Sequence, residues 1–339
     1  MKFTNATMSL EKIRHNPVML NQVLSIISPQ HGGTFIDCTF GGGGYSKAIL
    51  NYPDTKVFAI DRDKSTQKYA NDLTKKFPKR FSFSQNKFSD LNKIFEANLK
   101  PKAIIFDLGV SSFQLLDQKR GFSFYSKNFL SMEMGMNKYS AYDVVNNLDV
   151  KNLANIIKIL GEEKDGKRIA NAIIRNRLKK EIKTPEELTS IINYAKKNKN
   201  YNKNSATKTF QAIRIFVNQE LTQLILGLIA ATKLLSTGGK LIVISFHSLE
   251  DKIVKYFFNL YSNLKKNPSR YLPEEEKKSV LFSFFSKKPE TPTEKEIQSN
   301  NSSRSAKLRY AIKNNSLLFY PDDFKNIFLK YFEMESIKI

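Results

Sequence analysis

The chain has 339 residues, 41% of them hydrophobic and 12% aromatic, and this composition excludes a chain that is disordered throughout. Its one cysteine, Cys38, excludes an intrachain disulfide and favours the cytoplasm, and its three histidines lack metal-ligand spacing, so we predict no metal site. The formal net charge of +23 favours a polyanionic partner such as nucleic acid, although lysine enrichment of an AT-rich genome would supply part of it. No window reaches the ~18 to 20 apolar residues of a membrane span, so we expect a soluble protein without membrane partners.

Short apolar runs alternate with helical patterns in the first 110 residues, and another run follows near residue 240. Their sequences are TFIDCTF (34–40), KVFAIDRD (56–63), RFSFSQ (80–85), KAIIFDLG (102–109) and KLIVISFH (240–247). Apolar runs of this length, closed by polar residues or glycine, are typical of buried strands joined by crossover helices. We therefore predict an α/β fold with a doubly wound, mostly parallel sheet, whose ligands bind at the carboxyl ends of the strands.

Four consecutive glycines follow the first run, in the segment FIDCTFGGGGYSKAIL. A backbone this bare at a strand-to-helix turn favours a ligand that lies directly on the main chain, whereas a flexible turn is the alternative. Asp61 follows Gly41 by 20 residues, the distance at which such folds place an acid on ribose hydroxyls. Ser46 stands where a pyrophosphate-binding loop would have its third glycine, so the pattern favours adenosylmethionine over a dinucleotide.

The segment IIFDLGVSSFQLLDQKRGFSF (104–124) ends a predicted strand with Asp107. A carboxylate in such a turn can accept a hydrogen bond from a reacting amino group, which would suit group transfer to nitrogen. A turn or helix-capping acid is the alternative for Asp107. After the last run, Ser248 and Asp251 fit a capping box, and His247 either contacts substrate or holds the strand end.

The alternation of strands and helices breaks between about residues 120 and 210. VKNLANIIKIL (150–160) and KRIANAIIRNRL (167–178) have helical apolar periodicity, and Thr184 with Pro185 predicts a helix start. Residues 164–208 hold 13 basic and 4 acidic residues, which indicates either nucleic-acid contact or a solvated face. We predict a sheet domain in two parts, 1–120 and 209–339, an inserted all-helical subdomain over 121–208 that binds substrate, one long helix over about 209–235, and a mobile loop over 265–305.

Seven blocks in this order resemble the ribosomal RNA small subunit methyltransferase H family, also called MraW. They are HNPVMLNQVL, DCTFGGGGYS, IDRD, DLGVSSFQLLDQKRGFSF, TKTFQAIRIFVNQEL, SFHSLEDKIVKYFF and SRSAKLR. The resemblance implies a class I, Rossmann-like methyltransferase fold and an S-adenosyl-L-methionine cofactor. It also implies methylation of the N4 amino group of a cytidine in the decoding region of 16S ribosomal RNA, free or within a small-subunit particle.

The resemblance also implies site residues. Cofactor contacts fall on Gly43, Gly44, Tyr45, Asp61, Phe88, Asp107 and Gln114, and the catalytic candidates are Asp107, Ser111 and His247. Three departures stand out: Tyr45 replaces a histidine, Phe113 replaces a proline, and residues 130–137 replace a Leu-Asp-Met-Arg-Met-Asp block. The last departure concerns the substrate side of the predicted site.

Three other functions stay open at this point. The catalytic turn contacts a single base and does not distinguish one nucleic acid from another, so another RNA or DNA is an alternative substrate. Asp61 also allows a nicotinamide-dependent dehydrogenase, and the altered 130–137 block allows a noncatalytic RNA-binding or ribosome assembly factor. The sequence leaves the oligomeric state open, with a homodimer as one option.

Overall fold

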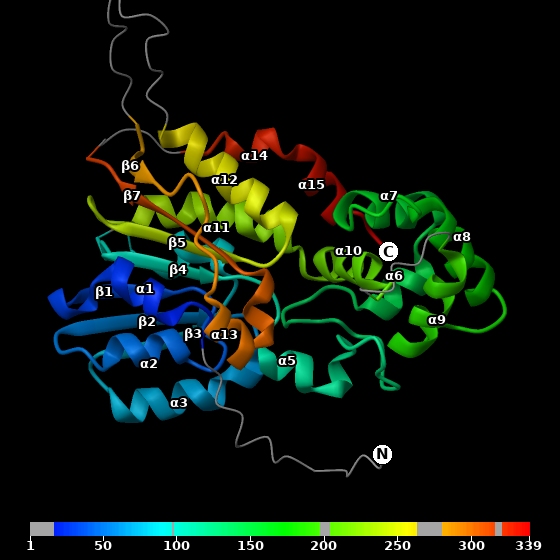
Figure 1. Cartoon of the computed structure of the whole chain (residues 1–339), viewed down its shortest axis with the longest axis horizontal. Coiled ribbons are helices and arrows are strands. Elements are labelled where there is room, and N and C mark those ends of the chain that lie inside the picture. The colour runs from blue at the N-terminus through cyan, green and yellow to red at the C-terminus, as the bar shows by residue number, and fades with distance from the viewer. Residues whose placement is uncertain (1–16, 97, 197–203, 263–279, 316–320) are drawn as a thin grey trace, which may run out of the picture.

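A computed structural model describes residues 17–96, 98–196, 204–262, 280–315 and 321–339. Its centre is a seven-stranded sheet with the order β3-β2-β1-β4-β5-β7-β6, and the first five strands in the chain run parallel (Figure 1). The strands are β1 Gly33–Asp37, β2 Thr55–Asp61, β3 Phe81–Gln85, β4 Ala103–Asp107, β5 Lys240–Ser245, β6 Phe282–Phe285 and β7 Lys307–Lys313. The predicted α/β class and all five predicted strands are confirmed.

Helices cover both faces of the sheet because the central strands bury side chains on both faces. Ile104 and Phe106 of β4 join a core with helices α11 and α12, whereas Ile105 between them joins a second core with α1 and α2. The helices of the sheet region are α1 Leu20–Ile27, α2 Gly44–Leu50, α3 Gln67–Lys76, α4 Leu91–Ile94, α5 Ser112–Leu116, α11 Glu220–Leu234, α12 Ser248–Ser262, α13 Glu294–Ser299, α14 Phe324–Ile327 and α15 Leu329–Glu335. This is the doubly wound arrangement that alternating runs predict.

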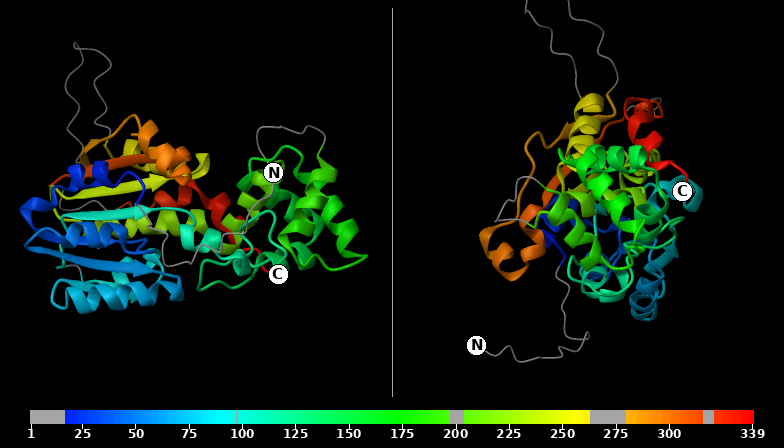
Figure 2. Two further views of the ribbon diagram at one scale, coloured as in Figure 1. Left: turned by 60° about the horizontal axis from the view of Figure 1, so that its bottom comes forward. Right: turned by 90° about the vertical axis from the view of Figure 1, so that its right-hand side faces the viewer.

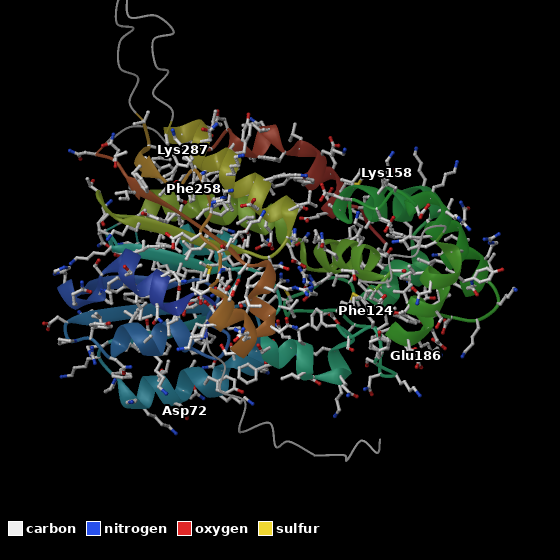
Figure 3. The ribbon with its side chains drawn as sticks, viewed as in Figure 1. Asp72, Phe124, Lys158, Glu186, Phe258 and Lys287 are labelled. Carbon is white, nitrogen blue, oxygen red and sulfur yellow. The ribbon has the colours of Figure 1, made fainter. Side chains whose placement is uncertain are left out.

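Further helices between β4 and β5 form a lobe beside the carboxyl ends of the strands (Figures 1 and 2). They are α6 Ala141–Asn147, α7 Val150–Leu160, α8 Gly166–Arg177, α9 Pro185–Ala195 and α10 Thr207–Asn218. α8 packs on α6, α7 and α9, and α10 packs on both α6 and α7. Phe124, from the segment that leads into the lobe, packs edge-on against Phe210 of α10 with ring centroids 4.8 Å apart (Figure 3).

Two helix starts test the capping predictions. Thr184 caps α9 through a capping box with Glu187, and Pro185 occupies the first turn, as predicted. The predicted box between Ser248 and Asp251 is wrong. The hydroxyl of Ser248 donates to Glu162, and Asp251 forms an ion pair with Arg309 at 2.7 Å.

The predicted single helix over 209–235 is also wrong, because it is two helices, α10 and α11, bent by 53°. Gln219 between them has the left-handed conformation, with φ 54° and ψ 38°. Nothing in the local composition marks this break, since Gln219 is neither glycine nor proline. Among the described residues, no single helix is both long enough and apolar enough to span a membrane. The bent pair of α10 and α11 meets both criteria only when the two helices are taken together.

The chain after α12 returns to the sheet in an unexpected way. Residues 265–279 of the predicted 265–305 loop lie outside the described residues, but β6 and α13 form within residues 280–305, so a loop is the wrong prediction there. β7 pairs antiparallel with β5, and β6 pairs antiparallel with β7. Residues 294–302 thereby reach the carboxyl edge of the sheet, where Asn300 and Ser302 line the main cavity.

Candidate active site

A cavity of about 310 Å³ opens at the carboxyl ends of β1, β2, β4 and β5. Parallel strands place the residues that follow them at one edge of a sheet, so the ends of distant segments meet there. Seven predicted site residues line this cavity, namely Gly44, Tyr45, Asp61, Phe88, Asp107, Ser111 and Gln114. Gly43 and His247 are not among its lining residues.

The glycine turn supplies the floor of the cavity beside β1. Gly41 and Gly43 have positive φ, 52° and 76°, and the N–H of Gly43 donates to the carbonyl of Phe40 at 2.7 Å. A Cβ on Gly43 would lie 2.8 Å from the ring of Phe40, so the packing of this ring requires glycine here. Gly41 and Gly44 present the backbone that lines the cavity.

Asp61 ends β2 and ties the glycine turn to the next loop. Its Oδ2 accepts from the N–H of Gly41 at 2.7 Å, and its Oδ1 accepts from the N–H of Asp63 at 2.8 Å. Burial raises the pKa of Asp61 to about 6. Each carboxylate oxygen keeps a lone pair for a further donor, so the carboxylate fits a ligand with two hydroxyl groups.

Asp107 ends β4 one strand further along the edge. Its N–H donates to the hydroxyl of Thr39 at 2.8 Å, whereas its Oδ1 is buried and accepts no hydrogen bond from the described residues. Burial, and then the charges of Asp37 and Glu250, raise the pKa of Asp107 well above its usual range. A buried carboxyl oxygen without a partner is costly, so it suits a ligand that brings an N–H group or a positive charge.

Ser111 and Gln114 hold the turn after Asp107 in place. Ser111 caps α5, because its hydroxyl accepts from the backbone N–H of Gln114 at 3.3 Å. In return, the side-chain Oε1 of Gln114 accepts from the N–H of Ser111 at 3.0 Å. The Gln114 amide also donates to Asp63 at 2.8 Å, and Asp63 pairs with Arg120 at 2.6 Å. The Ser111 hydroxyl is therefore engaged in helix capping.

Two aromatic residues close the sides of the cavity. Tyr45 is 4% exposed and its hydroxyl donates to the carbonyl of Val18, which fastens the segment before α1 over α2. Phe88 stands edge-on to Phe106 at 5.3 Å, and a Cβ on Gly227 of α11 would lie 2.7 Å from its ring. Gly227 thus gives Phe88 the room that it needs beside the cavity.

His247 lies behind the cavity and contacts Glu250. Its Nδ1 accepts from the N–H of Glu250 at 3.4 Å, so the ring proton belongs on Nε2, which lies 3.2 Å from the Glu250 Oε1. Glu250 itself is 1% exposed and lines the cavity. His247 was a candidate for direct contact with the substrate. In the structure Glu250, which sequence reasoning missed, lines the cavity in its place.

Glu220, His247 and Glu250 bring possible metal-ligand atoms within 4.8 Å of one another. Both oxygens of Glu220, however, accept from Arg214 at 2.8 Å, and the His247 Nε2 carries a proton and is no ligand in this state. The cluster is better described as the Arg214–Glu220 ion pair beside the contact of His247 with Glu250. The absence of a metal stays a prediction.

Arg214, Glu220, Gln223 and Glu250 all line the cavity and were absent from the sequence-based site. Arg214 and Glu220 stand in the block TKTFQAIRIFVNQEL and Glu250 in SFHSLED, so the resemblance contained them without marking a role. Charged residues within apolar helical stretches were the signal that could have found them.

The altered block 130–137 also reaches the cavity, through Met134. Arg62 fastens it, donating to the carbonyl of Gly135 at 2.6 Å and to that of Asn218 at 2.7 Å. Asn137 donates to the carbonyl of Val217 at 2.7 Å. The block is thus fixed against the end of α10 without the arginine and the aspartate that the family resemblance implies there.

Comparisons with known proteins show the family of this chain. The MraW methylase family matches residues 12–314. A ribosomal RNA small subunit methyltransferase H from Ehrlichia ruminantium (strain Welgevonden) is 45% identical over 88% of this chain and 99% of its own length. The protein of that name from Afipia carboxidovorans is 40% identical over 90% and 92%. A solved rRNA methylase from Streptococcus thermophilus covers 86% of this chain and 96% of its own, with 10% identity and a TM-score of 0.34.

Proposed function

This chain belongs to the MraW methylase family, and we propose that it methylates the N4 amino group of a cytidine in the decoding region of 16S ribosomal RNA. The observation that carries the proposal is Asp107, a buried carboxyl with an oxygen that has no partner among the described residues, in the same cavity as the glycine turn and Asp61. The curated relatives carry a name that specifies small-subunit ribosomal RNA. The choice of the N4 atom rests on the resemblance of the motifs.

The cofactor of this reaction is S-adenosyl-L-methionine, which supplies an electrophilic methyl group on a sulfonium. The residues present fit it. Asp61 offers two carboxylate oxygens to the ribose hydroxyls, Gly44 offers a bare backbone, and Phe88 offers a ring to the adenine side. The unpartnered oxygen of Asp107 suits the positive charges of the methionine portion or the amino group of the substrate.

The order of the strands supports a proposed assignment of the two ends of the cavity. β2, with Asp61, lies next to β1 and its glycine turn, and β4 and β5 follow on the other side of β1. The nucleoside end of the cofactor therefore belongs at β2, and the target base belongs at β4 and β5, near Asp107 and Phe246. Ser111 positions this turn through its cap of α5, and His247 acts from behind Glu250.

The helical lobe supplies a basic surface for the RNA. Lys167, Arg168, Asn171 and Arg175 of α8 are exposed and line a shallow hollow. Lys158 of α7 also points outward (Figure 3). Because the phosphate backbone dominates RNA affinity, we assign substrate binding to the inserted segment 121–208 and catalysis to the two flanking parts. The substrate would be a small-subunit particle in the cytoplasm.

Mass mapping of methylated nucleosides in small-subunit rRNA, from cells with and without the gene, tests the proposal. We expect one N4-methylated cytidine to disappear with the gene and to return when purified protein and S-adenosyl-L-methionine are added to particles from the deleted strain. Unchanged maps would contradict the proposal. Binding of particles without methyl transfer would favour a noncatalytic assembly factor, and transfer to another nucleic acid would change the substrate.

A further inference from the structure

Glu250 is the carboxylate on the substrate side of the cavity. In the pairing of β4 with β5, Asp107 lies opposite Ile244, and the chain then continues through Phe246 to the first turn of α12. Asp61 lies at β2, on the other side of the glycine turn. Neighbouring strands are about 4.8 Å apart, so Glu250 lies at the end of the cavity opposite to the proposed ribose contact.

The Glu250 carboxylate is held by its own helix start. Its Oε2 accepts from the N–H groups of Phe246 at 2.9 Å and His247 at 3.4 Å, and its Oε1 lies 3.2 Å from the His247 Nε2. With 1% of the residue exposed, it has one orientation and little water. Arg214 from α10 and Glu220 from α11 line the same part of the cavity, and Arg214 balances the charge of Glu220.

Two of the carboxyl groups that line the cavity, Asp107 and Glu250, have opposite electrostatic environments. Burial raises the pKa of Glu250, but His247, the Phe246 N–H and Arg214 more than offset this and bring the pKa below its usual value. At Asp107, burial and the charges of Asp37 and Glu250 all raise the pKa. Such a separation of two neighbouring carboxyl groups is the usual basis for different acid and base roles.

Methylation of an amino group requires a proton acceptor. The nitrogen lone pair forms the N–C bond while the C–S bond breaks and sulfur keeps its electron pair, so the nitrogen becomes positively charged and must release one of its two protons. We propose that Glu250 is the catalytic residue that accepts a hydrogen bond from the amino group and takes this proton. His247 is a positioning residue that orients the carboxylate, and the proton passes to solvent when the product leaves. This inference rests on the proposed function.

Single-turnover methylation of small-subunit particles under saturating S-adenosyl-L-methionine tests this role. Glu250→Gln keeps the size of the side chain and an oxygen for the Phe246 N–H but cannot take the proton. We expect the rate to fall by a factor of about 10² or more, with S-adenosyl-L-methionine affinity by calorimetry and particle affinity within threefold. Glu162→Gln is the matched control, because Glu162 is half-exposed and pairs with Lys252 of α12, the helix that carries Glu250. We expect its rate to be unchanged.

Glu250→Ala in sodium formate separates a chemical role from a structural one. A small carboxylate can fill the space that the side chain leaves. Formate should therefore raise the methylation rate of the alanine variant at least tenfold, whereas sodium chloride at equal ionic strength should not. A Glu250→Gln rate within threefold of wild type, or an alanine variant that folds, binds cofactor and gains nothing from formate, would overturn the role of Glu250. If wild-type protein methylates no particle, the proposed function fails instead.

Discussion

Asp61 is the residue on which the cofactor assignment depends most directly. Because its two oxygens are already oriented by Gly41 and Asp63, we expect Asp61→Ala to weaken S-adenosyl-L-methionine binding by roughly 1.5 to 3 kcal/mol, the range for hydrogen bonds to charged groups. Calorimetry measures this loss. Asp72→Ala, which removes an exposed acid from α3 (Figure 3), should leave affinity unchanged. Equal affinity of both variants would remove Asp61 from the site.

Asp107 has two roles compatible with its geometry, and one substitution distinguishes them. Asp107→Asn keeps the shape and removes the charge. If Asp107 contacts the amino group, the rate at saturating cofactor should fall by a factor on the order of 10², with cofactor affinity nearly kept. If it anchors the methionine amine, affinity should collapse while the saturated rate survives. Parallel calorimetry and single-turnover assays decide, and a variant that changes neither would exclude both roles.

At the residue scale, the sequence predicted the residues that end strands and missed those that helices bring in. Asp61 and Asp107 could be found because a strand end in a parallel sheet has a defined position. Arg214 and Glu250 stand out in the sequence only as charged residues in apolar helical stretches, because their place in the cavity depends on the bend after α10 and on the start of α12. His247 was the conspicuous residue of its segment, but Glu250 lies between it and the cavity.

At the scale of elements, the break between α10 and α11 is stabilised by the C-terminal helix. Glu335 of α15 is buried, and its carboxylate accepts from the N–H groups of Leu221 at 3.2 Å and Thr222 at 3.0 Å, at the start of α11. These donors have no partner within the helix, so their satisfaction by a side chain replaces an ordinary cap. α15 also packs on α10, and it therefore joins the helical lobe to the sheet region (Figure 1).

We expect Glu335→Ala to lower the free energy of unfolding by about 1 to 3 kcal/mol, because two buried N–H groups and the Thr222 hydroxyl lose their acceptor. Denaturant titration measures the loss. Glu333→Ala, a change two residues earlier in the same helix at an exposed position, is the control and should have little effect. A stability equal to that of wild type would mean that α15 does not brace this break.

The same carboxyl predicts a pH dependence of stability. Burial raises the pKa of Glu335 to about 8, from an ordinary value of 4.5, and the Thr222 hydroxyl can accept the carboxylic proton. Between these two values the folded chain holds a proton that the unfolded chain has released, so stability should fall as the pH rises, by on the order of 1 kcal/mol per unit. Glu335→Gln should lack this slope in denaturant titrations from pH 5 to 8. Identical slopes would contradict the assignment.

The sequence predicted the parallel strands, but the later elements required tertiary information. The first five strands have buried apolar runs that stand out from their surroundings. β7 has the sequence KLRYAIK, in which charged and apolar residues alternate, and it pairs antiparallel with β5. Its Arg309 can be buried because Asp251 of α12 forms an ion pair with it. The bend at Gln219 depends likewise on Glu335, 116 residues further along the chain.

At the scale of the whole molecule, positive charge and chemistry lie on different parts of the chain. The cavity belongs to the sheet region, whereas α8 belongs to the helical lobe and lies on the side of the lobe that is far from the sheet (Figure 1). A decoding-region RNA that reaches both would span the lobe with its phosphates and place one base at β4 and β5. Changes in α8 should therefore alter RNA binding without altering the cofactor site.

Reversing three charges of α8, in a Lys167→Glu, Arg168→Glu, Arg175→Glu variant, tests this separation. These side chains are exposed, so folding should be kept, while particle affinity at 100 mM salt should fall at least tenfold. The slope of log affinity against log salt should become shallower by about 0.7 for each lost phosphate contact. Cofactor affinity should stay within twofold.

The matched control reverses three exposed lysines of the sheet region, Lys75, Lys76 and Lys79. This control should have a smaller effect on particle affinity and on its salt dependence. Equal loss of particle binding in both variants would show that only net charge matters, and loss of cofactor binding would indicate unfolding of the α8 variant.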